Sequence, residues 1–195
     1  MTLPDTLPAT LPAAAHEVLN FWFSQPPARW FTKDAAFDLE IAQRFGATLE
    51  QALAGALAPW AETPRGALAL IIVLDQFTRN TLRGSARAFA GDGAALATAR
   101  SLVAGGHDKT LTTAKRQFSY LPFEHSENLA DQQASVHLFK QLAQDDAQAA
   151  GLVEWAQRHL DIVARFGRFP HRNAALGRAS TAEETEFLKQ PGSGF

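Results

Sequence analysis

The sequence contains no cysteine among its 195 residues. This absence excludes disulfides, catalysis by a thiolate and zinc sites built on cysteine. It fits a reducing compartment, so we expect a cytoplasmic protein. An excess of charge of one sign is also missing, because 18 basic and 20 acidic residues give a formal net charge of −2. We therefore expect no nucleic-acid partner and no binding to an anionic membrane surface.

Long hydrophobic runs and common catalytic motifs are missing as well. The longest strongly apolar stretch, residues 67–74, is too short to span a bilayer. The chain has no GxSxG, GxxxxGK or GxGxxG motif, which argues against a serine hydrolase elbow and against the usual nucleotide-binding loops. Dense metal-ligand spacing such as HExxH is absent too, so we expect no metal and no cofactor.

The N-terminus, MTLPDTLPATLP, repeats Thr-Leu-Pro three times at a spacing of four. It has no basic residue and no continuous apolar core, so we expect no signal peptide. Proline at this density prevents both helix formation and strand pairing. We predict a mobile arm over residues 1–12 and a single all-helical domain over residues 13–195.

Apolar residues recur with a helical period through most of the chain, and strand-like alternation is nearly absent. The pattern predicts helices over residues 13–23, from a cap at Asp34 to about residue 53, and from Thr63-Pro64 through the apolar run. Further helices are expected over residues 92–104, over 112–120 with an interruption at Pro122, over 127–143 after a cap at Ser126, and up to Gly167 with Trp155 on the apolar stripe. A final helix is expected after a capping box of Ser180 and Glu183.

Seven to nine helices with short connections favour antiparallel neighbours. We therefore predict an all-α fold of stacked antiparallel helical hairpins, arranged in a superhelix similar to tetratricopeptide repeats.

A short signature occurs twice. The sequence FTRN at residues 77–80 follows the apolar run LALIIVLDQ, and FPHRN at residues 169–173 follows HLDIVARFGR. In both places a long helical pattern ends in Phe, with Arg and Asn shortly after it. Such groups at the end of a buried helix need partners, because burying them unpaired costs a few kcal/mol each. The signature predicts a buried polar network or a pocket for a polar ligand.

The predicted ligand-binding residues of the two signatures are Arg79, Asn80, Arg172 and Asn173. A guanidinium offers five fixed donors that suit a carboxylate or phosphate, and the Asn amide adds further hydrogen bonds. Five arginines and one acid lie between residues 158 and 178, which also favours a small anion. The structural alternative is that these side chains cap helix carbonyls, with Asp75 as the internal partner of Arg79.

The candidate catalytic residues are His125, Glu127 and His171, as a general base with an orienting partner or as a titrating group. Arg116 and Tyr120 are expected to line the same cleft as ligand-binding residues. The structural alternative explains Glu127 by the helix dipole and pairs the Tyr120 hydroxyl with a neighbouring helix.

Several motifs, taken in order, resemble the bacterial domain-of-unknown-function family number nine-two-four. They are FWF and RWF, TPRGALALIIVLDQFTRN, LPFEHSE, RHLDIVARFGRFPHRN and the terminal PGSGF. The resemblance covers nearly the whole chain from about residue 15. The family is similar to tetratricopeptide-repeat folds, which implies an all-α superhelix of paired helices, and it supplies no established activity, substrate or cofactor. This chain has Thr78 where the family usually has proline, and a threonine hydroxyl can hold a similar turn.

Three functions stay open at this point. The leading hypothesis is an internal polar pocket that binds a small anionic metabolite or a peptide carboxylate, with Arg172 as the anion clamp. The second is an enzyme in which a His or Glu general base acts on an anionic substrate. The third is a scaffold that binds partner peptides on a concave helical surface, in which case the two signatures are structural.

Overall fold

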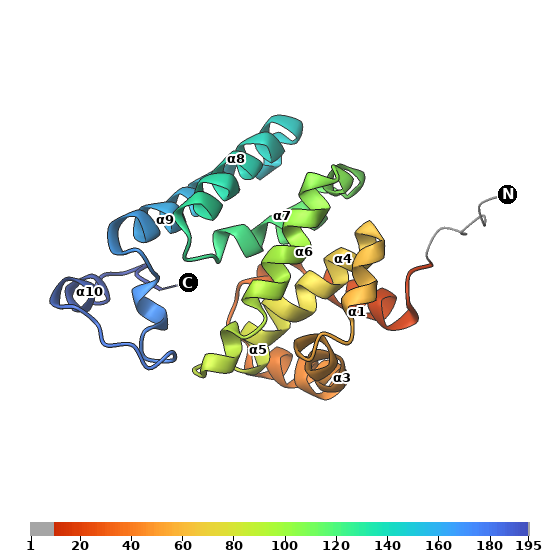
Figure 1. Cartoon of the computed structure of the whole chain (residues 1–195), viewed down its shortest axis with the longest axis horizontal. Coiled ribbons are helices and arrows are strands. Elements are labelled where there is room, and N and C mark those ends of the chain that lie inside the picture. The colour runs from red at the N-terminus through yellow and green to blue at the C-terminus, as the bar shows by residue number, and fades with distance from the viewer. Residues whose placement is uncertain (1–9, 195) are drawn as a thin grey trace, which may run out of the picture.

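The computed structural model describes residues 10–194, so most of the predicted arm over residues 1–12 lies outside the described residues. Within this range the chain forms helices, turns and irregular segments without any β-strand, which confirms the all-α prediction (Figure 1). The α-helices are α1 (Ala13–Phe23), α2 (Pro27–Trp30), α3 (Ala35–Leu53), α4 (Pro64–Ile71), α5 (Thr78–Thr81), α6 (Asp92–Ala104), α7 (Thr113–Glu124), α8 (Leu129–Asp145), α9 (Ala150–Phe166) and α10 (Ala182–Phe187). A π-helix, Ile72–Phe77, joins α4 to α5, and short 3-10 helices cover Ala58–Glu62, Ala86–Phe89, His107–Thr110, Ala147–Ala149 and Pro170–Arg172.

Helix α4 is the centre of the main core. It packs against α1, α6 and α7, while α8 packs against both α7 and α9. Figure 1 shows α8 and α9 side by side at one edge of the molecule, with α10 and the C-terminal segment beyond them. A smaller second core forms there from Ile162, Val163 and Phe169 together with Phe166 and Phe187. Among residues 10–194, no helix combines the length and the apolar composition that a bilayer span requires.

Two predicted helix starts are confirmed in atomic detail. The Asp34 carboxylate accepts the backbone N–H groups of Ala36 and Phe37 at 3.0 and 3.1 Å, which caps α3. The Thr63 hydroxyl accepts the N–H of Gly66 at 3.1 Å, with Pro64 as the first residue of α4. Both caps satisfy N–H groups that have no partner inside the helix.

Three predicted boundaries are wrong. Helix α7 continues through Pro122 to Glu124, because Pro122 lies in the last turn, where the buried aromatic residues around it hold the helix together. Asn128, and not Ser126, caps α8, since the Ser126 hydroxyl is bonded to Asp131. The capping box of α10 consists of Thr181 and Glu184, one residue later than predicted.

Two further expectations about side chains also fail. Trp155 is 51% exposed, although its position suggested the buried stripe of α9, and it packs instead beneath the Arg158 guanidinium, 5.0 Å from its ring centroid. Thr78 lies inside a helix and not at a turn, and its hydroxyl donates to the carbonyls of Leu74 and Asp75. A hydroxyl that bonds back to the preceding helical turn is compatible with a continuous helix.

The close approach of α6 to the π-helix requires a residue without a side chain. Gly91, the N-cap of α6, lies so near the backbone of Leu74 that a Cβ atom there would be 2.2 Å from the Leu74 carbonyl oxygen. This approach brings the first residue of α6, Asp92, toward the segment that carries Asp75 and Arg79.

We predict that Gly91→Ala lowers the free energy of unfolding by about 2–3 kcal/mol, because backbone atoms on both sides must move apart. Gly93→Ala is the matched control on the same helix, since a Cβ atom there has no neighbour within 4 Å. It should leave stability unchanged or raise it by up to about 1 kcal/mol. Urea unfolding of both variants measures the difference, and equal stabilities would contradict the close approach.

Candidate functional site

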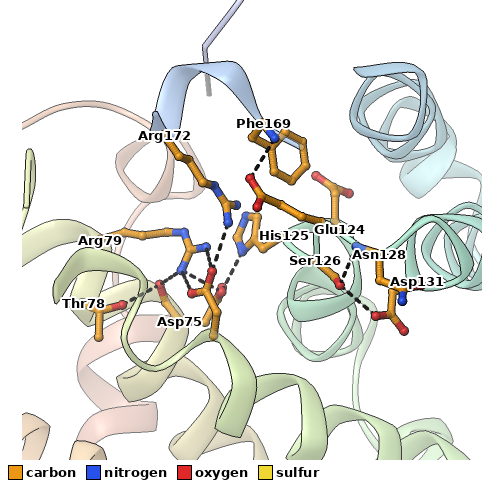
Figure 2. A network of polar contacts seen from close by, with 12 residues as sticks. Asp75, Thr78, Arg79, Glu124, His125, Ser126, Asn128, Asp131, Phe169 and Arg172 are labelled. Carbon is orange, nitrogen blue, oxygen red and sulfur yellow. Dashed lines mark hydrogen bonds and ion pairs between the residues drawn. The ribbon is translucent and has the colours of Figure 1, made fainter. Parts of the chain in front are cut away.

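The candidate site is built around a carboxylate in the core. Asp75 lies on the π-helix and is 0% exposed. Its Oδ1 is 3.0 Å from a terminal nitrogen of Arg79 and 2.6 Å from Nδ1 of His125, and its Oδ2 accepts the Gln76 amide at 2.5 Å. A buried charge needs such partners to offset its loss of water. We use "Asp75 cluster" for Asp75, Arg79, Asp92, His125 and Arg172 (Figure 2).

The Asp75 cluster joins the two signatures. Arg79 forms a two-pronged ion pair with Asp92, at 2.7 and 3.0 Å. The same Asp92 accepts a hydrogen bond from Arg172 at 3.2 Å, and Arg172 belongs to the second signature. The cluster therefore joins segments that are far apart in the chain: the π-helix, α5, α6, the end of α7 and the Pro170–Arg172 turn each contribute a side chain.

Arg172 is the least satisfied member of the cluster. Its side chain is buried, at 6% exposure, and its guanidinium carbon lies 4.5 Å from the Phe169 ring centroid and 4.8 Å from that of Phe89. The buried Nε atom has no hydrogen-bond acceptor among the described residues. Burial, together with the charge of Arg79, lowers the pKa of Arg172 to about 10, so the group stays charged at neutral pH.

His125 has a fixed tautomer. Burial disfavours the charge of Asp75, but Arg79 and His125 outweigh this effect and hold its pKa well below its usual range. An ionised carboxylate only accepts hydrogen bonds, so Nδ1 of His125 carries the hydrogen. Burial and the charge of Arg79 lower the pKa of His125. The neutral ring therefore keeps a lone pair on Nε2, and within residues 10–194 the hydrogen bond of this ring is made by Nδ1.

A second carboxyl–imidazole pair lies beside the first. Glu124 is 4% exposed, and its Oε1 is 3.2 Å from Nδ1 of His159 on α9. Burial and the negative charge of Asp75 raise the pKa of Glu124 to about 8, while burial lowers that of His159 to about 3. Both groups are thus mainly uncharged at neutral pH. The rings of His125 and His159 lie 6.3 Å apart between centroids.

Several predicted site residues form contacts that fit the structural alternative. The Glu127 carboxylate pairs with Arg178 through both oxygens, at 2.6 and 2.9 Å, and accepts the backbone N–H of Phe169 at 2.8 Å. Asn173 bonds Ser180, Glu184 and Arg178, and Asn80 donates to Asp38 at 2.7 Å. These contacts tie neighbouring segments together, and the lowered pKa of Glu127 suits an ion pair better than a general base.

Arg116 and Tyr120 form a separate group. The Tyr120 hydroxyl donates to Asp108 at 2.5 Å and accepts from Arg116 at 3.1 Å, and Arg116 also pairs with Asp145 at 2.7 Å. None of these partners belongs to the Asp75 cluster. Burial and the hydrogen bond to Asp108 raise the pKa of Tyr120 to about 12, so this hydroxyl stays protonated.

His171 packs against the Phe169 ring at 5.6 Å between centroids. Burial and the charge of Arg172 lower its pKa to about 4, so it does not titrate near neutral pH in this structure.

Among residues 10–194, no group of three or more His, Asp or Glu side chains is placed to hold a metal ion. Two surface cavities of about 360 and 370 Å³ share Arg65 and Lys115 in their walls and include no residue of the Asp75 cluster.

The structure adds three residues that sequence reasoning did not single out: Asp92, Glu124 and Arg178. Asp92 begins a predicted helix and Glu124 lies beyond the predicted end of another, and their sequence neighbours give no sign of a distant arginine or histidine. A partial signal existed for Arg178, which lies in the arginine-rich stretch.

The fold and the cluster together define an all-α protein with a buried network of ion pairs at the meeting point of its two signatures. Residues 18–192 match the family described as "Bacterial protein of unknown function (DUF924)". The chain belongs to this family, which confirms the resemblance. A solved structure of a protein of unknown function from Agrobacterium tumefaciens is similar at 40% identity and a TM-score of 0.84, covering 91% of this chain and 97% of that one. Among curated proteins, none matches this chain.

We predict that stability falls as the pH rises from about 7.5 to 9 because of Glu124. The folded side chain keeps its proton up to about pH 8, whereas the unfolded one loses it near 4.5. The folded state binds more protons in this window, so raising the pH destabilises it, by about 1 kcal/mol. Histidines with lowered pKa values contribute below this window, where they stabilise the fold as the pH rises toward 6.5.

Urea unfolding at both pH values measures this effect. Glu124→Gln should remove the fall in stability, whereas the exposed Glu154→Gln on α9 should keep it. A wild-type protein with equal stability at the two pH values would show that Glu124 is ionised in the fold.

Proposed function

We propose that the protein binds a small anion, or the carboxylate of a small metabolite or peptide, at the Nε edge of Arg172. This proposal is supported by the charged side chain of Arg172. It is only 6% exposed, and its Nε–H has no acceptor among the described residues. A buried donor left unsatisfied costs about 1–3 kcal/mol. Such a group in a folded protein calls for an explanation, and a bound anion or water is a physical one.

The surroundings of Arg172 suit an anion. The aromatic rings of Phe89 and Phe169 hold the guanidinium plane, so little side-chain entropy is lost when a ligand binds. Within the Asp75 cluster, Arg79 and Arg172 balance Asp75 and Asp92, and the three nearby histidines are mainly neutral. A charge-assisted hydrogen bond is strong where water is largely excluded.

A second candidate function is acid–base catalysis on the same anion. It is favoured by the His125–Asp75 pair, in which a buried carboxylate orients an imidazole and leaves Nε2 with a lone pair. Many hydrolytic sites use this arrangement for a general base. The π-helix that carries Asp75 adds support, since such turns occur frequently at functional sites. A cytoplasmic location and a repeat-like superhelix stay predictions of the sequence.

We predict that acetate, phosphate or bicarbonate raises the melting temperature of the wild-type protein at constant ionic strength. Ligands that bind the folded state alone stabilise it in proportion to the logarithm of their concentration. Arg172→Gln should lose this response. Arg172→Lys keeps a positive charge without the Nε donor and should weaken the response by at least about tenfold in concentration.

Arg158→Gln is the control, because Arg158 is an exposed arginine on α9. It should respond as the wild type does. Native mass spectrometry of freshly purified protein tests for an anion retained from the cell. Equal responses in the wild type and both Arg172 variants, or no response in any of them, would contradict the proposal.

A further inference from the structure

Two surface cavities adjoin one another, and both lie outside the Asp75 cluster. Their volumes are about 360 and 370 Å³, and the side chains of Arg65 and Lys115 belong to the walls of both. Arg65 lies in the first turn of α4, and Lys115 lies in the first turn of α7. The two cations therefore stand at the border of the cavities. Each cavity has the volume of a site for a small organic molecule.

The cavity walls carry positive charge that no acid compensates. Among the residues of 10–194 that line them, none is an Asp or a Glu. Within the same part of the chain, Arg65 is the one arginine that forms no ion pair. Lys115 has no carboxylate partner there either, and its ammonium lies 5.6 Å from the centroid of the Phe23 ring. Two like charges thus share one place in a chain whose other arginines all pair with acids.

Both cations also occupy positions that a helix disfavours. The N-terminus of a helix carries a partial positive charge, so a cation in the first turn is unfavourable and an anion there is favoured. Neither α4 nor α7 has an acidic residue in its first turn. The cavity of about 360 Å³ includes the N-cap residues of both helices, Thr63 and Thr112, beside Arg65 and Lys115. A bound anion would offset the unfavourable charge at both helix starts.

The start of α4 is held in a fixed position. The Thr63 hydroxyl caps the helix at Gly66, and a Cβ atom on Gly66 would lie 2.0 Å from the Trp60 carbonyl oxygen. The packing of α4 against α1 and α7 then brings Arg65 and Lys115 into the same cavity walls. The backbone of this place is preformed, so binding a ligand requires the ordering of two side chains and no movement of a helix.

We propose that these two cavities form a second ligand site, which binds a phosphate monoester that carries a small apolar or aromatic group. Two uncompensated cations match a dianion, and a phosphate monoester carries close to two negative charges at neutral pH because its second pKa is about 6. Its oxygens accept charge-assisted hydrogen bonds from both side chains. The organic group would lie along apolar wall residues, such as Phe23 in one cavity and Leu111 in the other. This site does not depend on Arg172.

Calorimetric titration of the full chain with phenyl phosphate, at about pH 7.5 and constant ionic strength, tests the site. Arg65→Gln and Lys115→Gln should each weaken binding by at least about tenfold, as expected for the loss of one charge-assisted hydrogen bond. Arg158→Gln and Lys140→Gln are the matched controls, because each removes one exposed positive charge that lies outside both cavity walls. Both controls should bind phenyl phosphate as the wild type does.

Two further probes test the chemistry of the ligand. Phenyl sulfate has the same shape as phenyl phosphate but carries a single charge, so it should bind at least about threefold more weakly. Inorganic phosphate has the charge without the apolar group and should bind at least about tenfold more weakly than phenyl phosphate.

Stability and NMR measurements distinguish a binding role from a structural one. Without ligand, Arg65→Gln should leave the melting temperature unchanged or raise it by about 1–3 °C, because it removes a cation from the first turn of α4. A structural role for Arg65 would lower the melting temperature. Phenyl phosphate should shift the backbone amide signals at the starts of α4 and α7, and it should do so equally in Arg172→Gln.

The outcomes separate this site from the one proposed at Arg172. Equal affinity for phenyl phosphate in the wild type, Arg65→Gln and Lys115→Gln, or no binding at millimolar concentration, would overturn the second site and leave Arg172 as an anion site. Loss of binding in Arg172→Gln alone would assign the probe to the Asp75 cluster and also overturn it. Tighter binding of phenyl sulfate would overturn the dianion. Acetate and bicarbonate report on Arg172 separately, because neither is a dianion near neutral pH.

Discussion

The structure depends on one buried negative charge. Asp75 is ionised and lies wholly inside the protein, where an uncompensated carboxylate would cost several kcal/mol. Its compensation requires Arg79 from the following helix and His125 from the end of α7. Arg79 also forms an ion pair with Asp92 on α6, and Asp92 forms a second ion pair with Arg172 near the C-terminus. Segments up to about a hundred residues apart are thereby held together, because each buried charge needs a partner of opposite sign.

The local backbone makes this possible. A π-helix has wider turns than an α-helix, and here it holds the buried carboxylate, while the preceding α4 supplies a continuous apolar surface for the core. The Leu74 carbonyl in the same segment accepts the Thr78 hydroxyl and touches Gly91. A larger residue at position 91 would push α6 away and separate Asp92 from both arginines. The ion pairs in this region therefore depend on the close backbone packing between α6 and the π-helix.

Much of the fold follows from local patterns, and much of the site does not. The four-residue apolar spacing of α3 and the caps Asp34 and Thr63 are contained in short windows, so their prediction succeeds. Ser180 and Thr181 are both able to cap α10, and the sequence alone does not decide between them. In the structure Thr181 caps the helix together with Glu184, and Glu184 also accepts a hydrogen bond from the distant Arg168. The repeated signature indicated a polar cluster. It did not indicate Asp92, Glu124 or the π-helix, because long-range contacts determine them.

The C-terminal segment has a small core of its own around Ile162, Val163 and Phe169. Its contacts with the rest of the protein include the Arg172–Asp92 and Arg178–Glu127 ion pairs, which are only partly exposed to solvent. Salt strongly screens the attraction between exposed charges, whereas buried or partly buried pairs are screened much less. These two pairs therefore join the C-terminal segment to α6 and to the segment before α8 by contacts that added salt weakens less than it weakens the exposed pairs of the surface.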